Sequence, residues 1–259
     1  MHMANIVCPY CGHIPFKTEK GLAWHLEHIH GVSLDKSENI GQDSPDVSAL
    51  RLQLSEYEVE HLHYMIPVEN CQSILDNGIL SFNRAEEIEH INLASSSVQR
   101  QRDKIVIDFD KHIHDYVPLY FATHTPMQYV WTQSSSKKGP VLKQEELIFI
   151  DLDAFQTLQI QEILITDGNA AAADTNFYGT PIDLSVLDWK IIKTQDCYSP
   201  EYKRKKSAEV LVPDCVPAKY FSRVVVCSND IAKRLRRTKN VSLRHLRIVV
   251  DPDYYYQCS

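Results

Sequence analysis

Short runs of apolar and polar residues alternate along much of the chain, and their periods predict a compact domain of mixed α and β structure. β-Branched and alternating runs predict strands at residues 61–66, 114–121, 146–152, 160–166, 209–213, 223–227 and 246–250. Helical patterns predict short helices at 68–77, 84–90, 95–103, 126–131 and 230–237. We therefore expect one domain over residues 61–250, followed by a tail over 251–259.

Segments that lack a helical or strand period are predicted to connect these elements. Residues 32–60 are mostly polar and predict a linker, in which Asp46–Tyr57 has the spacing of a short helix. Gly78 follows the helix 68–77 at the position where a helix end needs left-handed backbone. Residues 170–202 are long and weakly periodic, so they predict a lid or a substrate loop that leads towards Glu209.

The composition is that of an ordinary globular protein, with 44% hydrophobic and 24% charged residues in a chain of 259. Because the formal net charge is −7, contacts with nucleic acid would have to use local basic patches, at 203–206 and 233–237. None of the eight glycines lies in a phosphate-binding GxGxxG or GxxxxGKS loop, and the sequence holds no serine nucleophile elbow. Kinase, NTPase and hydrolase functions are therefore disfavoured.

Nothing in the sequence predicts a membrane or a secreted protein. No stretch approaches the roughly 20 apolar residues of a membrane helix, and no charged-then-apolar leader opens the chain. Seven scattered cysteines suit a reducing compartment better than a disulfide scaffold. We expect a cytoplasmic protein with no membrane partner.

The first 31 residues have the ligand spacing of a small zinc finger. Cys8 and Cys11 can reach one metal ion from a knuckle, and His25 and His30 can complete a tetrahedral site. His28 is a rival for the last position, three residues after His25. We expect a zinc finger over residues 1–31 that either adds weak affinity for nucleic acid or docks another protein.

Glu209 is the strongest candidate for a catalytic residue. It begins a short apolar strand, where a side chain can be fixed by a sheet and still face a cleft. It also follows four consecutive cations, Lys203, Arg204, Lys205 and Lys206, which would favour an anionic ligand. A strand that merely begins with an acidic residue is the alternative interpretation.

Aromatic and guanidinium groups supply further candidate contacts. Tyr178 precedes the basic run, and this combination suits a single-stranded nucleic acid whose bases stack while its phosphates pair with cations. Tyr120, Phe121 and Tyr129 could wall a pocket for a flat heterocycle, or could belong to the core. Arg102 ends a predicted helix and has the planar fork that clamps a diphosphate, although many such arginines are surface residues.

An ordered set of segments resembles the DarT family of NAD-dependent ADP-ribosyltransferase toxins, which modify DNA bases. Each segment is weakly specific alone, but together they keep the order and approximate spacing of the family over about residues 62–227. The segments are Tyr64–Asn70, Ser73–Leu80, Val98–Arg102, His114–Phe121, Pro126–Tyr129, Asp167–Ala170, Thr175–Tyr178, Asp188–Trp189 and Ala208–Val212.

The resemblance implies an α+β fold, with the split, twisted β-sheet of the ADP-ribosyltransferase type, peripheral helices, and NAD in the cleft between the two halves of the sheet. Glu209 matches the catalytic glutamate, and Arg102 matches the arginine that holds the diphosphate and helps to activate the target base. Asn70 matches an asparagine near the cofactor. Tyr64, with His63 beside it, stands where the family presents a histidine or an aromatic substitute to the nicotinamide ribose. The predicted NAD contacts are His63, Tyr64, Asn70, Arg102, Tyr120, Phe121 and Tyr129.

The resemblance also implies a reaction, the transfer of ADP-ribose to a nucleobase, with single-stranded DNA as the favoured acceptor. Such a protein would act as the toxin of a toxin–antitoxin or phage-defence system and would have an antitoxin partner. RNA or a protein side chain is an alternative acceptor. A non-catalytic zinc-finger protein with an inert transferase-like domain stays open, because Tyr64 and Ile66 depart from the family's histidine and threonine. The zinc finger lies outside the resemblance.

Overall fold

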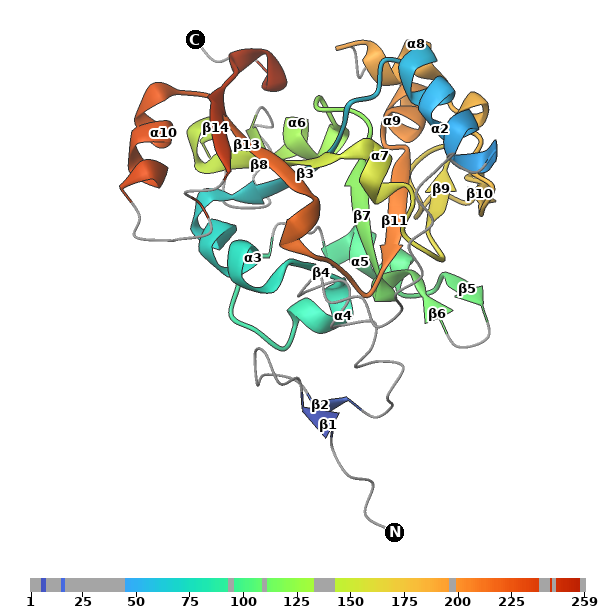
Figure 1. Ribbon diagram of the computed structural model, residues 1–259, viewed down its shortest axis with the longest axis horizontal. Helices are drawn as coiled ribbons and strands as arrows, with labels where there is room; N and C mark the ends of the chain where they lie inside the picture. Colours follow the sequence, from blue (N-terminus) through green and yellow to red (C-terminus); the bar gives the residue numbers. More distant parts are fainter. Residues whose placement is uncertain are drawn as a thin grey trace.

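The protein is built on an eight-stranded mixed sheet with strand order β10-β9-β11-β7-β3-β8-β13-β14 (Figure 1). The computed structural model describes residues 6–7, 15–16, 45–92, 96–108, 111–132, 143–195, 199–237, 243 and 246–256. The strands of the sheet are β3 (His61–Pro67), β7 (Tyr116–Tyr120), β8 (Leu147–Asp153), β9 (Leu164–Thr166), β10 (Phe177–Tyr178), β11 (Glu209–Pro213), β13 (Phe221–Val226) and β14 (Arg247–Val250).

The sheet divides into two halves between β7 and β3. β3 pairs with β8 from His61 to Pro67, but its register with β7 is a single pair, His63 with Tyr120. All neighbouring strands are antiparallel except β13 and β14, which are parallel. The mixed sheet confirms the α+β class, and the single pair marks the boundary between the two halves.

Short helices surround the sheet. In Figure 1, α10 (Asn229–Arg236) lies beside β14 at one end, and α8 (Trp189–Lys193) and α9 (Pro200–Lys206) lie towards the other. The remaining α-helices are α2 (Pro45–Glu56), α3 (Cys71–Asn77), α4 (Phe82–Ala85), α5 (Ser96–Arg102), α6 (Pro126–Thr132) and α7 (Ala154–Thr157). Three small ladders pair β1 (Ile6–Val7) with β2 (Pro15–Phe16), β4 (Ile79–Leu80) with β12 (Cys215–Val216), and β5 (Val106–Asp108) with β6 (Lys111–His112).

The folded domain extends beyond residues 61–250 at both ends. α2 forms where a short helix was expected, and its Leu50 and Leu54 are buried in the main core, so residues 45–60 are part of the domain rather than a linker. At the other end Tyr255 is buried, and its hydroxyl donates to the carbonyls of Leu147 and Val225. Residues 251–256 therefore complete a core cluster and do not form a free tail.

Two predicted elements are shorter in the structure. For the first, the reason is that buried apolar residues in a turn give the same pattern as a strand. Ile160 and Ile163 are buried, yet they precede β9 in a turn after α7, so only the end of the predicted strand 160–166 joins the sheet. The polar helix expected at 84–90 is the single turn α4. The expected loop 170–202 carries β10 and α8.

The predicted zinc ligands Cys8, Cys11, His25 and His30 lie outside the described residues. Within the part of the chain that the structure describes, no group of three or more metal-ligating side chains is placed to hold a metal ion. None of the helices described there is long and apolar enough to cross a membrane.

Gly78 ends α3 in a conformation that other residues avoid. Its φ is +78° and its ψ is 178°, and its N–H donates to the carbonyl of Ile74 at 2.8 Å. A Cβ atom at this position would lie 2.6 Å from the carbonyl oxygen of Val216 on β12. Both the backbone angles and the close approach of β12 therefore require glycine.

We predict that Gly78→Ala lowers the free energy of unfolding by about 1–3 kcal/mol, the cost of holding a non-glycine residue in this region of φ and ψ. Urea denaturation of the two proteins measures the difference. Gly179→Ala is the matched control, since its nearest atom, Leu164 Cδ2, would be 3.8 Å from the new Cβ. Equal unfolding midpoints for Gly78→Ala and the wild type would contradict the prediction.

Candidate active site

A cavity of about 420 Å³ lies at the opening between the two halves of the sheet. Its walls come from elements on both sides of this opening, and they combine aromatic rings with a few polar groups, as ligand sites in proteins usually do. Residues that line it include Tyr64, Asn70, Arg102, Tyr120, Trp131 and Asn169. Four of the predicted NAD contacts, Tyr64, Asn70, Arg102 and Tyr120, are thus brought to one cavity.

A buried ion pair joins Arg102, which lines this cavity, to Glu209, which lies behind it and does not line the cavity. Arg102 Nη1 lies 3.2 and 3.1 Å from the two carboxylate oxygens, and Nη2 lies 3.1 Å from Oε2. The side chains are 8% and 0% exposed. Burial alone would lower the pKa of Arg102, but the Glu209 carboxylate outweighs it and raises that pKa. Arg102 therefore stays positively charged, with the Glu209 carboxylate as its buried partner.

Backbone contacts hold Glu209 from its other side. The N–H of Ala170 donates to Glu209 Oε1 at 3.2 Å. The N–H of Glu209 donates to the Thr166 hydroxyl at 3.0 Å, and this hydroxyl donates to the carbonyl of Gly168 at 2.7 Å. Asp167–Ala170 belongs to the segments that resemble the family, but no role for Thr166 or Ala170 was expected, because no local pattern shows that β9 and β11 are neighbours.

Two tyrosines line the cavity from opposite halves of the sheet. Tyr64 belongs to β3 and Tyr120 to β7. Burial raises the pKa of Tyr64 to about 12, although the charge of Arg102 acts against it. The pKa of Tyr120 is raised further by burial and by the charge of Glu209. Both hydroxyls therefore stay protonated at neutral pH and can donate hydrogen bonds to a ligand.

His114 is a cavity residue for which the sequence suggested no role. It is buried, its Nε2 lies 2.8 Å from Gln99 Oε1, and its ring stacks on Phe82 with centroids 4.4 Å apart. Burial, aided by the charge of Arg102, lowers its pKa, so the ring is neutral at pH 7. Gln99 and His114 both lie in segments that resemble the family, and this was the signal available in the sequence.

The other three predicted NAD contacts do not line this cavity. His63 points to the opposite face of β3 from Tyr64, since neighbouring side chains in a strand alternate, and its Nδ1 lies 2.7 Å from Asp151 Oδ1. Phe121 is buried with its ring edge-on to Trp189. Tyr129 is 47% exposed.

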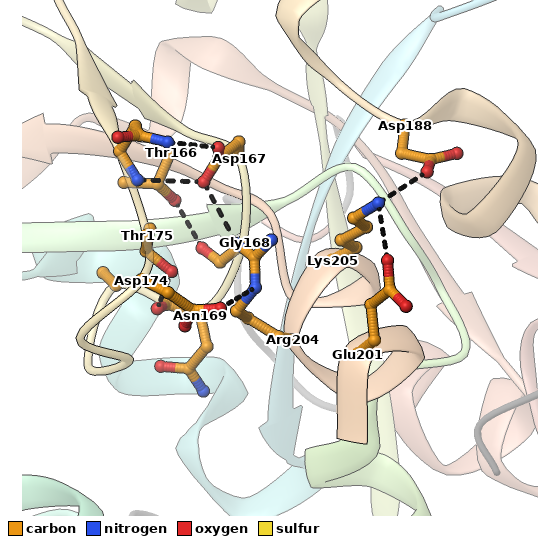
Figure 2. Close-up of polar contacts among 12 residues, drawn as sticks. Thr166, Asp167, Gly168, Asn169, Asp174, Thr175, Asp188, Glu201, Arg204 and Lys205 are labelled. Carbon is orange, nitrogen blue, oxygen red and sulfur yellow. Dashed lines mark hydrogen bonds and ion pairs between the residues drawn. The ribbon is translucent and has the colours of Figure 1, made fainter. Parts of the chain in front are cut away.

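The basic run 203–206 lies on α9, and most of its charges are paired within the protein. Figure 2 shows Arg204 between two carboxylates, Asp167 at 3.2 Å and Asp174 at 3.0 Å. Lys205 lies between two more, those of Asp188 at 3.1 Å and Glu201 at 3.0 Å. Two of the four cations that were predicted to contact nucleic acid thus already have anionic partners.

Lys206 does not have the accessibility that a nucleic-acid contact needs, because it is 1% exposed and its amino group donates to the carbonyl of Ile192 at 3.4 Å. A buried amino group cannot meet a phosphate from solvent. Lys203 is exposed on α9, and Tyr178 is half-buried on the edge strand β10. These two keep the accessibility that a nucleic-acid contact needs.

We predict that the stability effects of Arg102 and Glu209 are strongly coupled. Arg102→Met and Glu209→Gln each leave one buried charge without its partner, a change that costs about 3–5 kcal/mol. The double variant leaves none and should lose less than the sum of the two, by about 0.5–3 kcal/mol. Urea denaturation of the four proteins measures this cycle.

The exposed pair Lys193–Glu58 is the matched control, with side chains 45% and 80% exposed. Lys193→Met and Glu58→Gln should change the unfolding midpoint little, alone or together, because water screens such pairs. Additive losses for Arg102 and Glu209 would mean that the two charges do not stabilise each other.

Relatives of this chain are DNA ADP-ribosyl transferases. A protein of Thermosipho africanus described as a DNA ADP-ribosyl transferase–DNA ADP-ribosyl glycohydrolase fusion protein is 28% identical over 201 residues, which cover 75% of this chain and 49% of that protein. The chain therefore spans about half the length of this relative. A DNA ADP-ribosyl transferase of Thermus aquaticus is 27% identical over 208 residues, covering 78% of this chain and 88% of the relative.

Solved structures share the fold. The DarT of Thermus sp. 2.9 in complex with ADP-ribosylated single-stranded DNA matches with a TM-score of 0.66 at 22% identity, over 77% of this chain and 97% of that one. The T. africanus DarTG in complex with ADP-ribose matches with a TM-score of 0.65 at 27% identity, over 76% and 51%. Residues 63–256, a range that holds both Arg102 and Glu209, match the family model for the single-stranded DNA thymidine ADP-ribosyltransferase DarT. The chain belongs to the DarT family.

Proposed function

We propose that this protein is an NAD-dependent ADP-ribosyltransferase that transfers ADP-ribose to a nucleobase in single-stranded DNA. The observation that carries the proposal is the buried ion pair of Glu209 with Arg102, which lines a cavity together with Tyr64 and Tyr120. The family match, and the structure of a relative in complex with ADP-ribosylated single-stranded DNA, support this substrate class.

The groups around the cavity fit an anionic dinucleotide with two flat rings. Arg102 supplies a permanent positive charge, and none of its three contacts with Glu209 uses Nε. A diphosphate oxygen can therefore meet the guanidinium while the carboxylate stays in place. Tyr64, Tyr120 and Trp131 supply apolar faces for a heterocycle.

In this mechanism Glu209 is the catalytic carboxylate. When NAD is bound, departure of nicotinamide places positive charge on the ribose, and a fixed carboxylate stabilises that charge electrostatically. Glu209 is fixed by Arg102 on one side and by the Ala170 N–H on the other, so it needs little reorganisation. It can also take a proton from the attacking base nitrogen, help that is typically worth about 10²–10⁴-fold.

We further propose that the protein is a toxin held in check by an antitoxin in the cytoplasm. The support is the T. africanus relative, whose name joins a DNA ADP-ribosyl transferase to a DNA ADP-ribosyl glycohydrolase in one chain. A glycohydrolase breaks the bond that a transferase makes, so a partner with that activity would reverse the modification. The predicted zinc finger at residues 1–31 would add weak nucleic-acid affinity or dock such a partner.

We predict that the wild type incubated with labelled NAD attaches ADP-ribose to a base in single-stranded DNA and releases nicotinamide. Duplex DNA, single-stranded RNA and protein extract are the parallel acceptors, and mass spectrometry of the digested nucleosides identifies the modified base. Glu209→Gln should reduce transfer by about 10²–10⁴-fold, because it removes the charge and the base at nearly constant volume.

Glu145→Gln, an exposed carboxylate next to β8, is the control that should transfer at the wild-type rate. Label on RNA alone would move the acceptor to RNA. Full transfer by Glu209→Gln would rule out its catalytic role. A folded wild type that neither transfers ADP-ribose nor releases nicotinamide would be an inert member of the family.

A further inference from the structure

The loop 167–176 joins β9 to β10 and supplies a hydrogen bond to Glu209. Ala170 lies in this loop, and its N–H donates to Glu209 Oε1 at 3.2 Å. Because a backbone donor cannot rotate towards its acceptor, the position of the whole loop decides whether this bond exists. Whatever fixes the loop therefore also fixes one side of the carboxylate.

Arg204 contacts the loop at three points on both sides of Ala170. Its Nη1 lies 3.2 Å from Asp167 Oδ1 and its Nε lies 3.0 Å from Asp174 Oδ2, as Figure 2 shows. Its carbonyl oxygen accepts from the N–H of Asn169 at 2.9 Å. One residue of α9 thus ties the start, the middle and the far side of the loop together.

The pair with Asp167 is the stronger of the two side-chain contacts. Arg204 and Asp167 are 17% and 16% exposed, whereas Asp174 is 74% exposed and its pair is screened by water. Burial acts to raise the pKa of Asp167, but hydrogen bonds from Asn176 and the charge of Arg204 outweigh it and hold that pKa below its usual range. Asp167 is therefore ionised at neutral pH.

Gly168 allows Arg204 to lie across the loop. A Cβ atom on Gly168 would be 2.6 Å from Arg204 Nη1, 2.9 Å from its Cγ and 3.1 Å from its carbonyl oxygen. The first two contacts are with the side chain of Arg204. The glycine is thus matched to the arginine, and a side chain at 168 would push the guanidinium away from Asp167.

We propose that Arg204 is a positioning residue for the transfer reaction, which holds the 167–176 loop so that the Ala170 N–H stays on the Glu209 carboxylate. The inference rests on the proposed function, in which Glu209 is the catalytic carboxylate. Arg204 lies on α9, and Glu209 begins β11, the next element along the chain. A loop that is bound to Arg204 is therefore also held next to Glu209. Its N–H groups already meet two carboxylates, so it works inside the protein rather than on a DNA phosphate.

Steady-state kinetics with single-stranded DNA and NAD distinguish an Arg204 that positions the loop from an Arg204 that binds a DNA phosphate. We expect Arg204→Gln to lower kcat by roughly 10- to 100-fold, because small misplacements of catalytic groups cost rates of this order, with KM for both substrates nearly unchanged. Arg204→Lys, which keeps the charge, should recover part of the loss, and Lys219→Gln, an exposed lysine on another element, should match the wild type. A raised KM for DNA with unchanged kcat, and a salt slope smaller by about 1, would mean that Arg204 binds phosphate and would overturn the proposal.

A double-mutant cycle in kcat tests the match between Gly168 and Arg204. Gly168→Ala should lower kcat in the wild type, where the new Cβ meets the arginine side chain. In an Arg204→Ala background, the contacts at 2.6 and 2.9 Å no longer exist, so Gly168→Ala should cost much less. Fully additive losses would overturn the proposal, since they would mean that the two residues act independently.

Hydrogen exchange at the Ala170 amide tests the inference without any activity. We expect Arg204→Gln to speed exchange at Ala170, while amides of β8 and β13 keep their protection. If Arg204→Gln does not fold, Asp174→Asn removes only the exposed contact and should give a smaller change in the same direction. Unchanged exchange at Ala170 would overturn the proposal. If the wild type transfers ADP-ribose to no acceptor, the proposed function fails, but this measurement still decides whether Arg204 holds the loop.

Discussion

The buried ion pair between Arg102 and Glu209 is the interaction on which the rest of the site depends. Two charges removed from water are stable only if they meet each other with good geometry and their remaining hydrogen-bonding groups are satisfied. Here the arginine ends α5, the carboxylate begins β11, and a further donor comes from the loop after β9. Three segments far apart in sequence must therefore fold together before either charge can be buried, so the site is assembled as a unit.

The opening of the sheet at β3 and β7 gives this unit its access to ligands. Tyr64 and Tyr120 line the cavity on one face. On the opposite face of β3, His63 bonds Asp151, which also accepts from Arg223 Nε at 2.8 Å and from the Tyr254 hydroxyl at 2.9 Å. Burial acts to raise the pKa of Asp151, but its contacts with His63, Arg223 and Tyr254 hold that pKa below its usual range. This polar network joins β3, β8, β13 and the C-terminal segment, and so keeps one wall of the cavity in place.

Most of the basic side chains of α9 make contacts within the protein rather than with solvent. Lys205 and Arg204 each bond two carboxylates, and Lys206 is buried against Ile192. Their common effect is to hold α9 against its neighbours, which fixes the start of β11 and with it Glu209. An anionic ligand near this helix would meet mainly the exposed Lys203, so the field that it experiences is smaller than four adjacent cations suggest.

The sequence by itself determined the mixed α and β class, most element positions and the glycine at the end of α3, because these follow from periods and turn signals that are read within a few residues of each other. It singled out Arg102 and Glu209 as candidate site residues only through their place in a long ordered set of segments. Only the tertiary structure decided that His63 faces away from the cavity and that α2 and Tyr255 belong to the core. It also decided that Arg204 and Lys206 bond groups within the protein. The physical reason is that a side chain's role depends on its partners, and these lie far away in sequence: 88 residues separate His63 from Asp151, and 107 separate Arg102 from Glu209.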